Sequence, residues 1–218
     1  MTEEQKETLK FYTTNDYLLI NGLLWKESKD IIDEFIHLIN ADGLGVMQEA
    51  LELGFDVRWN CSKEDGNKIY KMYQKRFPVI ENDDIKKEII ERARNDIKNM
   101  MDCLVLIETK LVLYRNIKTR FISNIEEGKL FKNLGFSSCS LNPHVAENAE
   151  YGSSNCTLFE ITVPVGTPAI RLDLMSDICN EEDEVILPPM EFLVTKIDKE
   201  NNKVYMTCNA LLESECEY

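Results

Sequence analysis

The spacing of hydrophobic residues changes about halfway along the chain. In the first half, apolar side chains recur every three or four positions, which is the period of an amphipathic helix. Near the start, Thr14 or Asn15 can cap a helix that carries Tyr17, Ile20 and Leu24 on one face. Similar apolar stripes predict further helices over about 28–39, 46–53, 62–76 and 83–100.

The second half of the chain favours strands. Apolar residues there alternate with polar ones or form short runs, and 200–203 is typical of a hairpin turn. The pattern predicts strands over 111–114, 157–163, 169–172, 185–187, 192–197 and 204–207. Helices followed by strands indicate an α+β fold. We expect one domain over residues 1–218, mostly helical in 1–107 and mostly β in 108–218.

Composition and charge narrow the class of protein. Hydrophobic residues make up 44% of the 218 residues and charged residues 29%, as in ordinary globular domains. No apolar run approaches the ~20 residues of a membrane span. The formal net charge of −14 disfavours nucleic acid as a partner. The polar start of the chain lacks a secretory signal, so we expect a protein that is cytoplasmic where made, or delivered without a classical signal peptide.

The cysteine pattern and the glycine pattern argue against two common kinds of site. The seven cysteines contain no Cys-x-x-Cys pair, and there are only two histidines, so we expect reduced thiols and no metal. Gly43 and Gly45 follow a predicted helix and lack the third glycine of a Rossmann turn. Any dinucleotide must therefore bind by another design.

Three polar elements in the second half carry candidate chemistry. Arg115 ends a predicted strand, where a guanidinium can form two parallel hydrogen bonds to a diphosphate. A run of small residues follows over 135–140, and it includes Ser138. Glu182 and Glu184 precede an apolar strand, and residues two apart in an extended chain face the same side. Taken singly, each element also fits a surface salt bridge, a serine-rich loop or a solvated acidic loop.

The order of these elements resembles the R-S-E clade of mono-ADP-ribosyltransferases. That clade includes the binary actin-modifying toxins, the VIP2-type toxins and the C3-like exoenzymes. The match comprises an arginine, then Ser-x-Ser, then Glu-x-Glu before three apolar residues and a proline. The segments 12–21 and 159–164 are similar to the family's first helix and to its strand after the serine motif. The resemblance covers roughly residues 8–26 and 108–198.

The resemblance implies a fold and a set of site residues. The fold would be a helical layer packed on two roughly perpendicular, mainly antiparallel sheets. Arg115 would bind the diphosphate of NAD, and Ser138 would hydrogen-bond Glu184. Glu184 would hold the nicotinamide ribose and stabilise its cationic transition state, while Glu182 would position an acceptor guanidinium. The other expected NAD-binding residues are Tyr12, Tyr17, Asn21, Asn116, Gly135 and Tyr151.

The implied activity is transfer of ADP-ribose from NAD to an arginine of a target protein. Cleaving NAD creates an oxocarbenium-like cation, which a fixed carboxylate stabilises. Glu182 favours arginine, because members with Gln at this position modify asparagine. We expect a monomeric toxin or effector with NAD as co-substrate and no metal, and actin is one candidate target.

Two alternatives and several departures from the family pattern stay open. The alternatives are an NAD glycohydrolase, with water as acceptor, and a binding module that has lost catalysis. Cys139 replaces the usual threonine, and Trp25 stands where the first helix often has arginine. The loop at 177–180, which reads the target in this family, lacks its expected aromatic residue.

Overall fold

The described part of the chain is a mixed α+β fold with nine strands and three α-helices. The computed structural model describes residues 1–13, 20, 21, 24, 83–119, 122, 125–148, 156–175 and 183–212. The helices are α1 (Glu3–Phe11), α6 (Asp83–Asp102) and α7 (Pro143–Asn148), with a short 3-10 helix at Leu172–Leu174. No helix among these residues is long and apolar enough to cross a membrane.

The strands occupy the second half of the chain, as the sequence predicts. They are β1 (Val105–Leu106), β2 (Leu111–Lys118), β3 (Leu130–Asn133), β4 (Ser137–Ser140), β5 (Cys156–Val163), β6 (Pro168–Arg171), β7 (Glu184–Leu187), β8 (Met190–Asp198) and β9 (Lys203–Leu211). All six predicted strands are confirmed, although β2, β8 and β9 extend beyond their expected ends. Strands β1, β3 and β4 and helix α7 were not among the predicted elements.

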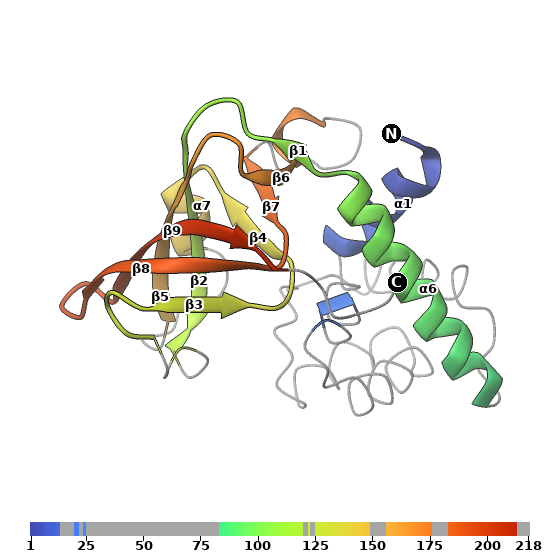
Figure 1. Ribbon diagram of the computed structural model, residues 1–218, viewed down its shortest axis with the longest axis horizontal. Helices are drawn as coiled ribbons and strands as arrows, with labels where there is room; N and C mark the ends of the chain where they lie inside the picture. Colours follow the sequence, from blue (N-terminus) through green and yellow to red (C-terminus); the bar gives the residue numbers. More distant parts are fainter. Residues whose placement is uncertain are drawn as a thin grey trace.

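Strand pairing links the nine strands in the order β1-β6-β7-β4-β2-β5-β9-β8-β3. Every pair is antiparallel except β5–β9, which is parallel. The order divides at β4 and β2, which share only the pair Tyr114 and Ser140. The structure therefore has one continuous nine-stranded sheet where two sheets were expected, and its two halves meet at this pair. In Figure 1, β7 runs steeply across the view while β8 and β3 run nearly horizontally.

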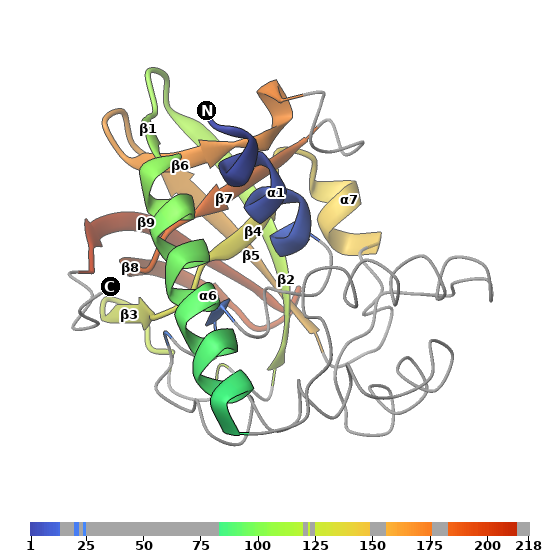
Figure 2. The ribbon, with the colours of Figure 1, turned by 90° about the vertical axis from the view of Figure 1, so that its right-hand side faces the viewer.

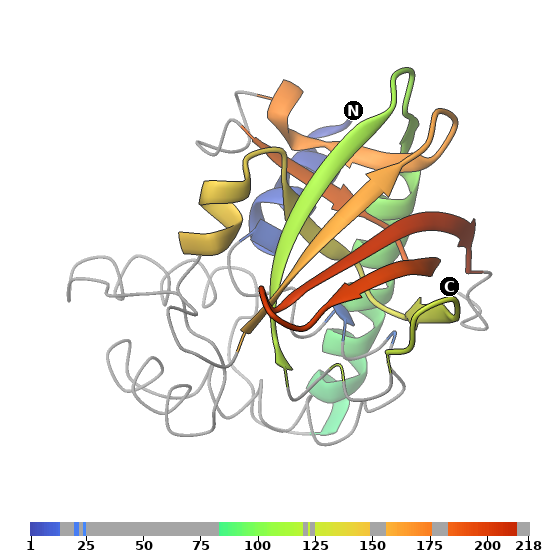
Figure 3. The same cartoon turned by 90° about the vertical axis from the view of Figure 1, so that its left-hand side faces the viewer.

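Strand β9 follows all other strands in the sequence, yet it lies inside the sheet. It pairs with β5 on one side and with β8 on the other. The turn between β8 and β9 contains Asn202, whose φ of 48° is left-handed. Figure 3 shows β8 and β9 crossing the sheet beside β5.

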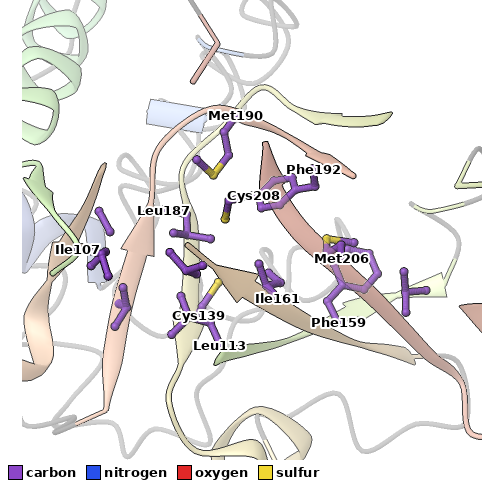
Figure 4. Close-up of a cluster of buried hydrophobic side chains, with 14 of the residues drawn as sticks. Ile107, Leu113, Cys139, Phe159, Ile161, Leu187, Met190, Phe192, Met206 and Cys208 are labelled. Carbon is purple, nitrogen blue, oxygen red and sulfur yellow. The ribbon is translucent and has the colours of Figure 1, made fainter. Parts of the chain in front are cut away.

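The main hydrophobic core takes side chains from both halves of the sheet (Figure 4). Along β5, buried and partly exposed residues alternate, so Phe159, Ile161 and Val163 face this core. Val185 and Leu187 of β7 face it from the other half. Burial of these apolar surfaces is the dominant force that holds the two halves together.

A second core joins the helices to the outer side of the β6–β7–β4 half. Ile97 and Met100 of α6 pack there with Leu9 of α1 and Ile186 of β7. Figure 2 shows both helices lying over these strands. The helix predicted from position 83 is therefore confirmed, with its apolar stripe buried from Ala93 onward. Strand β7 is consequently buried on both faces.

Helix α1 was not predicted, although the sequence carries a signal for it. Thr2 Oγ1 accepts a hydrogen bond from Gln5 N at 3.2 Å, and Gln5 Oε1 accepts one from Thr2 N at 2.8 Å. This is a capping box, readable as Thr-x-x-Gln. Of the helix predicted around 14–24, residues 20, 21 and 24 are helical. The helices predicted over 28–39, 46–53 and 62–76 lie outside the described residues.

Candidate active site

Two neighbouring strands bring Ser138 and Glu184 together. Strands β4 and β7 pair with Ser140 opposite Glu184 and Ser138 opposite Ile186. These four residues therefore share the face of the sheet that looks toward the helices. The Ser138 hydroxyl donates a hydrogen bond to Glu184 Oε1. The side chain of Glu184 is 7% exposed, so its carboxylate is held in a largely water-free setting.

Arg115 joins this pair from β2. It follows Tyr114, the residue at which β2 pairs with β4, and its partner on the other side is Phe159 of β5. The Arg115 guanidinium donates a hydrogen bond from Nη1 to the carbonyl oxygen of Ser138 at 3.3 Å. The three residues with the most specific predicted roles thus lie at one place, where the two halves of the sheet separate.

Tyr12 enters the site from the helical layer. Its side chain is buried, and its ring meets Phe136 edge-on with centroids 6.0 Å apart. Burial raises the pKa of the Tyr12 hydroxyl. The positive charge of Arg115 partly opposes this rise, and the negative charge of Glu184 reinforces it. The hydroxyl therefore lies within the field of both charged site residues and stays protonated at neutral pH.

Asn21 is also buried, and its side chain bonds to the backbone of Phe136. Phe136 N donates to Asn21 Oδ1 at 2.7 Å, and Asn21 Nδ2 donates to Phe136 O at 3.2 Å. Phe136 lies between Gly135 and the start of β4. The Asn21 amide thus contacts the run 135–140 directly.

Asn133 supports the same run at the residues on either side of Phe136. Its Nδ2 donates to the carbonyl oxygen of Gly135 and, at 2.8 Å, to Ser137 Oγ. Sequence reasoning missed both Asn133 and Phe136. An asparagine two residues before a glycine is a turn signal that could have marked Asn133.

The remaining predicted site residues differ in what the structure says of them. Gly135 is buried beside the site strand. Asn116 follows Arg115 on β2, so alternation directs its side chain to the opposite face of the strand. Tyr17, Tyr151 and Glu182 lie outside the described residues.

Cys139 lies between the site serines but faces the main core. Burial raises the pKa of its thiol to about 12, so it remains neutral at physiological pH. The four cysteines in the described ranges are all free thiols. Among the described residues, no group of three or more His, Cys, Asp or Glu side chains could hold a metal ion.

This arrangement suits cleavage of a glycosidic bond next to a diphosphate. A buried carboxylate fixed by a serine can stabilise positive charge on a ribose, because the charge interaction is strong where water is excluded. A guanidinium a few ångströms away can hold a diphosphate with paired hydrogen bonds. Arg115, Ser138 and Glu184 therefore fit the polar groups of NAD.

Two solved structures of one toxin, Vis, support the fold. Vis toxin, an ADP-ribosyltransferase from Vibrio splendidus, aligns with a TM-score of 0.51 and 17% identity over 99% of this chain and 76% of its own. Vis in complex with agmatine aligns with a TM-score of 0.52 and 17% identity over 98% and 77% of the two chains. The Clostridium limosum C3 exoenzyme gives a TM-score of 0.49 and 15% identity over 96% and 87%.

Two comparisons of the sequence with known proteins give different results. A search of curated protein sequences finds no match. A family model described as ADP-ribosyltransferase exoenzyme, however, matches residues 1–213. That match includes both the helical layer and the sheet that carries Arg115, Ser138 and Glu184. The chain therefore belongs to the ADP-ribosyltransferase exoenzyme family, toxin-type transferases that use NAD as the source of ADP-ribose.

Proposed function

We propose that this enzyme transfers ADP-ribose from NAD to an arginine of a target protein. The observation that carries the proposal is the buried Glu184 carboxylate, held by Ser138 beside Arg115. Glu184 stabilises the ribosyl cation as nicotinamide leaves, and Arg115 binds the diphosphate. Nicotinamide leaves as a neutral molecule, so the step needs no general acid.

Glu182 supports arginine as the acceptor. It precedes Glu184 by two residues, so an extended chain directs both carboxylates to the same side. A protonated guanidinium is a poor nucleophile, and a carboxylate beside it can orient it and assist loss of its proton. The solved complex of Vis with agmatine is consistent with this chemistry, because agmatine carries a guanidinium.

We further propose that the enzyme acts as a monomer on a protein of a host cell, with actin as one candidate. Membership in a family of toxin-type transferases supports delivery into such a cell. The charge of −14 favours a target with a basic surface, because opposite charges speed association.

Labelled NAD tests the proposal directly. The protein is incubated with adenylate-labelled NAD and a cell lysate, and both protein label and released nicotinamide are measured. We expect label on protein, and we expect an arginine-specific ADP-ribosyl hydrolase to remove it. Glu184→Ala should lower nicotinamide release about 100- to 1,000-fold, the range for losing one preorganised electrostatic group. Release of nicotinamide with label only in free ADP-ribose would show a glycohydrolase instead.

The acceptor role of Glu182 has its own test. Glu182→Gln should abolish arginine labelling while NAD hydrolysis persists, because only the acceptor side loses its carboxylate. Asp183→Asn is the matched control, since it changes the neighbouring acid, and it should leave labelling intact. Equal loss of labelling and hydrolysis in Glu182→Gln would contradict the proposed role.

A further inference from the structure

Asn21 makes an unusual pair of contacts for a helical residue. Its side chain is 2% exposed, and its amide bonds both backbone groups of Phe136. Phe136 is 115 positions away in the sequence and belongs to the segment that enters β4. The helical layer thereby holds the backbone of the site strand at one residue.

The geometry of these contacts imitates strand pairing. In an antiparallel ladder, one residue exchanges an N–H and a C=O with its partner. The Asn21 amide supplies the same two groups from a side chain. Phe136 lies one position before the first residue of β4, so the clamp takes the place of a neighbouring strand there.

The clamped residue is connected to the chemistry in two ways. Ser138 lies two positions further along, and it gives its hydroxyl hydrogen to Glu184 and accepts a hydrogen bond from Arg115. The Phe136 ring also packs edge-on against Tyr12. A shift of the Phe136 backbone would therefore displace Ser138 relative to both charged residues.

We infer that Asn21 is a positioning residue for NAD cleavage, which acts through the backbone of Phe136 to place Ser138 against Glu184. The sequence resemblance instead implies that Asn21 contacts NAD. The two roles predict different kinetics. A positioning residue affects mainly kcat, whereas an NAD contact made equally in ground and transition states affects mainly KM.

The test compares Asn21→Ala with Thr8→Val. Thr8 Oγ1 donates to Asp96 Oδ1 at 2.8 Å, so Thr8→Val also removes a buried hydrogen bond of the helical layer, but one that joins α1 to α6. We expect Asn21→Ala to lower kcat for nicotinamide release about 10- to 100-fold, as small misplacements of reacting groups do. KM for NAD should change less than threefold. Thr8→Val should retain kcat.

Amide hydrogen exchange tests the hydrogen bonds between Asn21 and Phe136 without a measurement of activity. In Asn21→Ala, the amide of Phe136 loses its acceptor and should exchange at least tenfold faster, while the amides of β5 keep their protection. In Asn21→Asp, a carboxylate oxygen still accepts from Phe136 N, so this amide should stay protected while kcat falls. If Asn21→Ala does not fold, the Asn21→Asp comparison applies in its place.

The outcomes separate this inference from the proposed function on which it rests. A tenfold rise in KM with unchanged kcat in either Asn21 variant, or unchanged exchange at Phe136 in Asn21→Ala, would overturn the positioning role. If Thr8→Val lowers kcat as much as Asn21→Ala does, the contribution of Asn21 is to the general stability of the helical layer and not to the position of Ser138. If the unaltered protein releases no nicotinamide, the proposed function fails, and faster exchange at Phe136 would still demonstrate the clamp.

Discussion

At the scale of single residues, the contact between Ser138 and Glu184 controls how the carboxylate with the proposed catalytic role is held. A buried carboxylate has few rotamers that avoid a clash, and the serine hydroxyl selects one of them. The same serine offers its carbonyl oxygen to Arg115, so one residue contacts both charged groups of the site. Under the proposed roles of Arg115 and Glu184, small changes at Ser138 should therefore affect both NAD binding and bond cleavage.

Removing the Ser138 hydroxyl should weaken catalysis without unfolding the protein. We expect Ser138→Ala to lower kcat/KM for nicotinamide release about 10- to 100-fold, the equivalent of one hydrogen bond to a charged group. Ser140→Ala is the matched control, because its Oγ accepts from Asn142 N at 2.9 Å on the same strand face. Continuous fluorescence of a nicotinamide-releasing NAD analogue measures both. Similar losses in the two variants would contradict a specific role for Ser138.

At the scale of elements, the hairpin of β8 and β9 depends on one backbone conformation. Asn202 has a left-handed φ of 48°, and its carbonyl oxygen accepts from Leu158 N at 2.9 Å. Asparagine tolerates this region better than most residues. The turn therefore fixes the register of β8 against β9 and also connects to β5.

Substitutions at Asn202 should separate conformation from side-chain contacts. Asn202→Ala should lower the free energy of unfolding by about 1 kcal/mol, because alanine adopts a left-handed φ at a cost. Asn202→Gly should be close to neutral, since glycine has no such penalty. Urea denaturation followed by circular dichroism measures the difference. Equal stability of the alanine and glycine variants would show that φ at this turn carries no cost.

The elements also show which features of the fold are readable from sequence. Helix α6 and strand β5 have long, regular apolar patterns, so both were predicted. Strand β1 has only two residues, and β3 and β4, with four each, lack the run of three apolar residues that marks the equally short β7. Helix α7 has only six residues, too few for an apolar period, although its start carries a capping signal: Asn142 Oδ1 accepts from His144 N at 3.0 Å and Pro143 is the first helical residue.

The site was readable in part for a related reason. Arg115, Ser138 and Glu184 stand in a recognisable order, and the pairing of β4 with β7 brings two of them together. The supporting contacts of Asn21 and Asn133 go to backbone groups of Phe136 and Gly135. No local pattern specifies which backbone a side-chain amide will reach, because that depends on tertiary packing.

At the scale of the whole molecule, buried thiols make stability depend on pH. Burial raises the pKa of Cys139 and of Cys208 from 9.0 to about 12. Both thiols remain protonated in the folded state above pH 9, while the unfolded chain releases their protons. Their contribution to stability is therefore complete below pH 9 and is lost as the pH rises from 9 toward 12. Tyr12 adds to the loss above its ordinary pKa of 10.0.

Raising the pH from 7 to 10 should thus destabilise the protein. Each thiol should contribute about 1.4 kcal/mol, which corresponds to one pH unit above its unfolded pKa. Cys208→Ala should reduce the pH-dependent loss by that amount. Val204→Ala, another truncation in the same core, should lower stability equally at both pH values. Urea unfolding at pH 7 and pH 10 provides the measurement. If Cys208→Ala loses as much stability between the two pH values as the unaltered protein, this assignment is wrong.

The position of β9 has a consequence for how the protein is made. The strands leave the ribosome in sequence order, but β5 and β8 do not meet until β9 enters between them. Nascent chains that lack residues 203–211 therefore cannot join β8 and β3 to β5 and to β2, the strand that carries Arg115. Folding must wait for nearly the whole described chain, and contacts between distant segments form slowly.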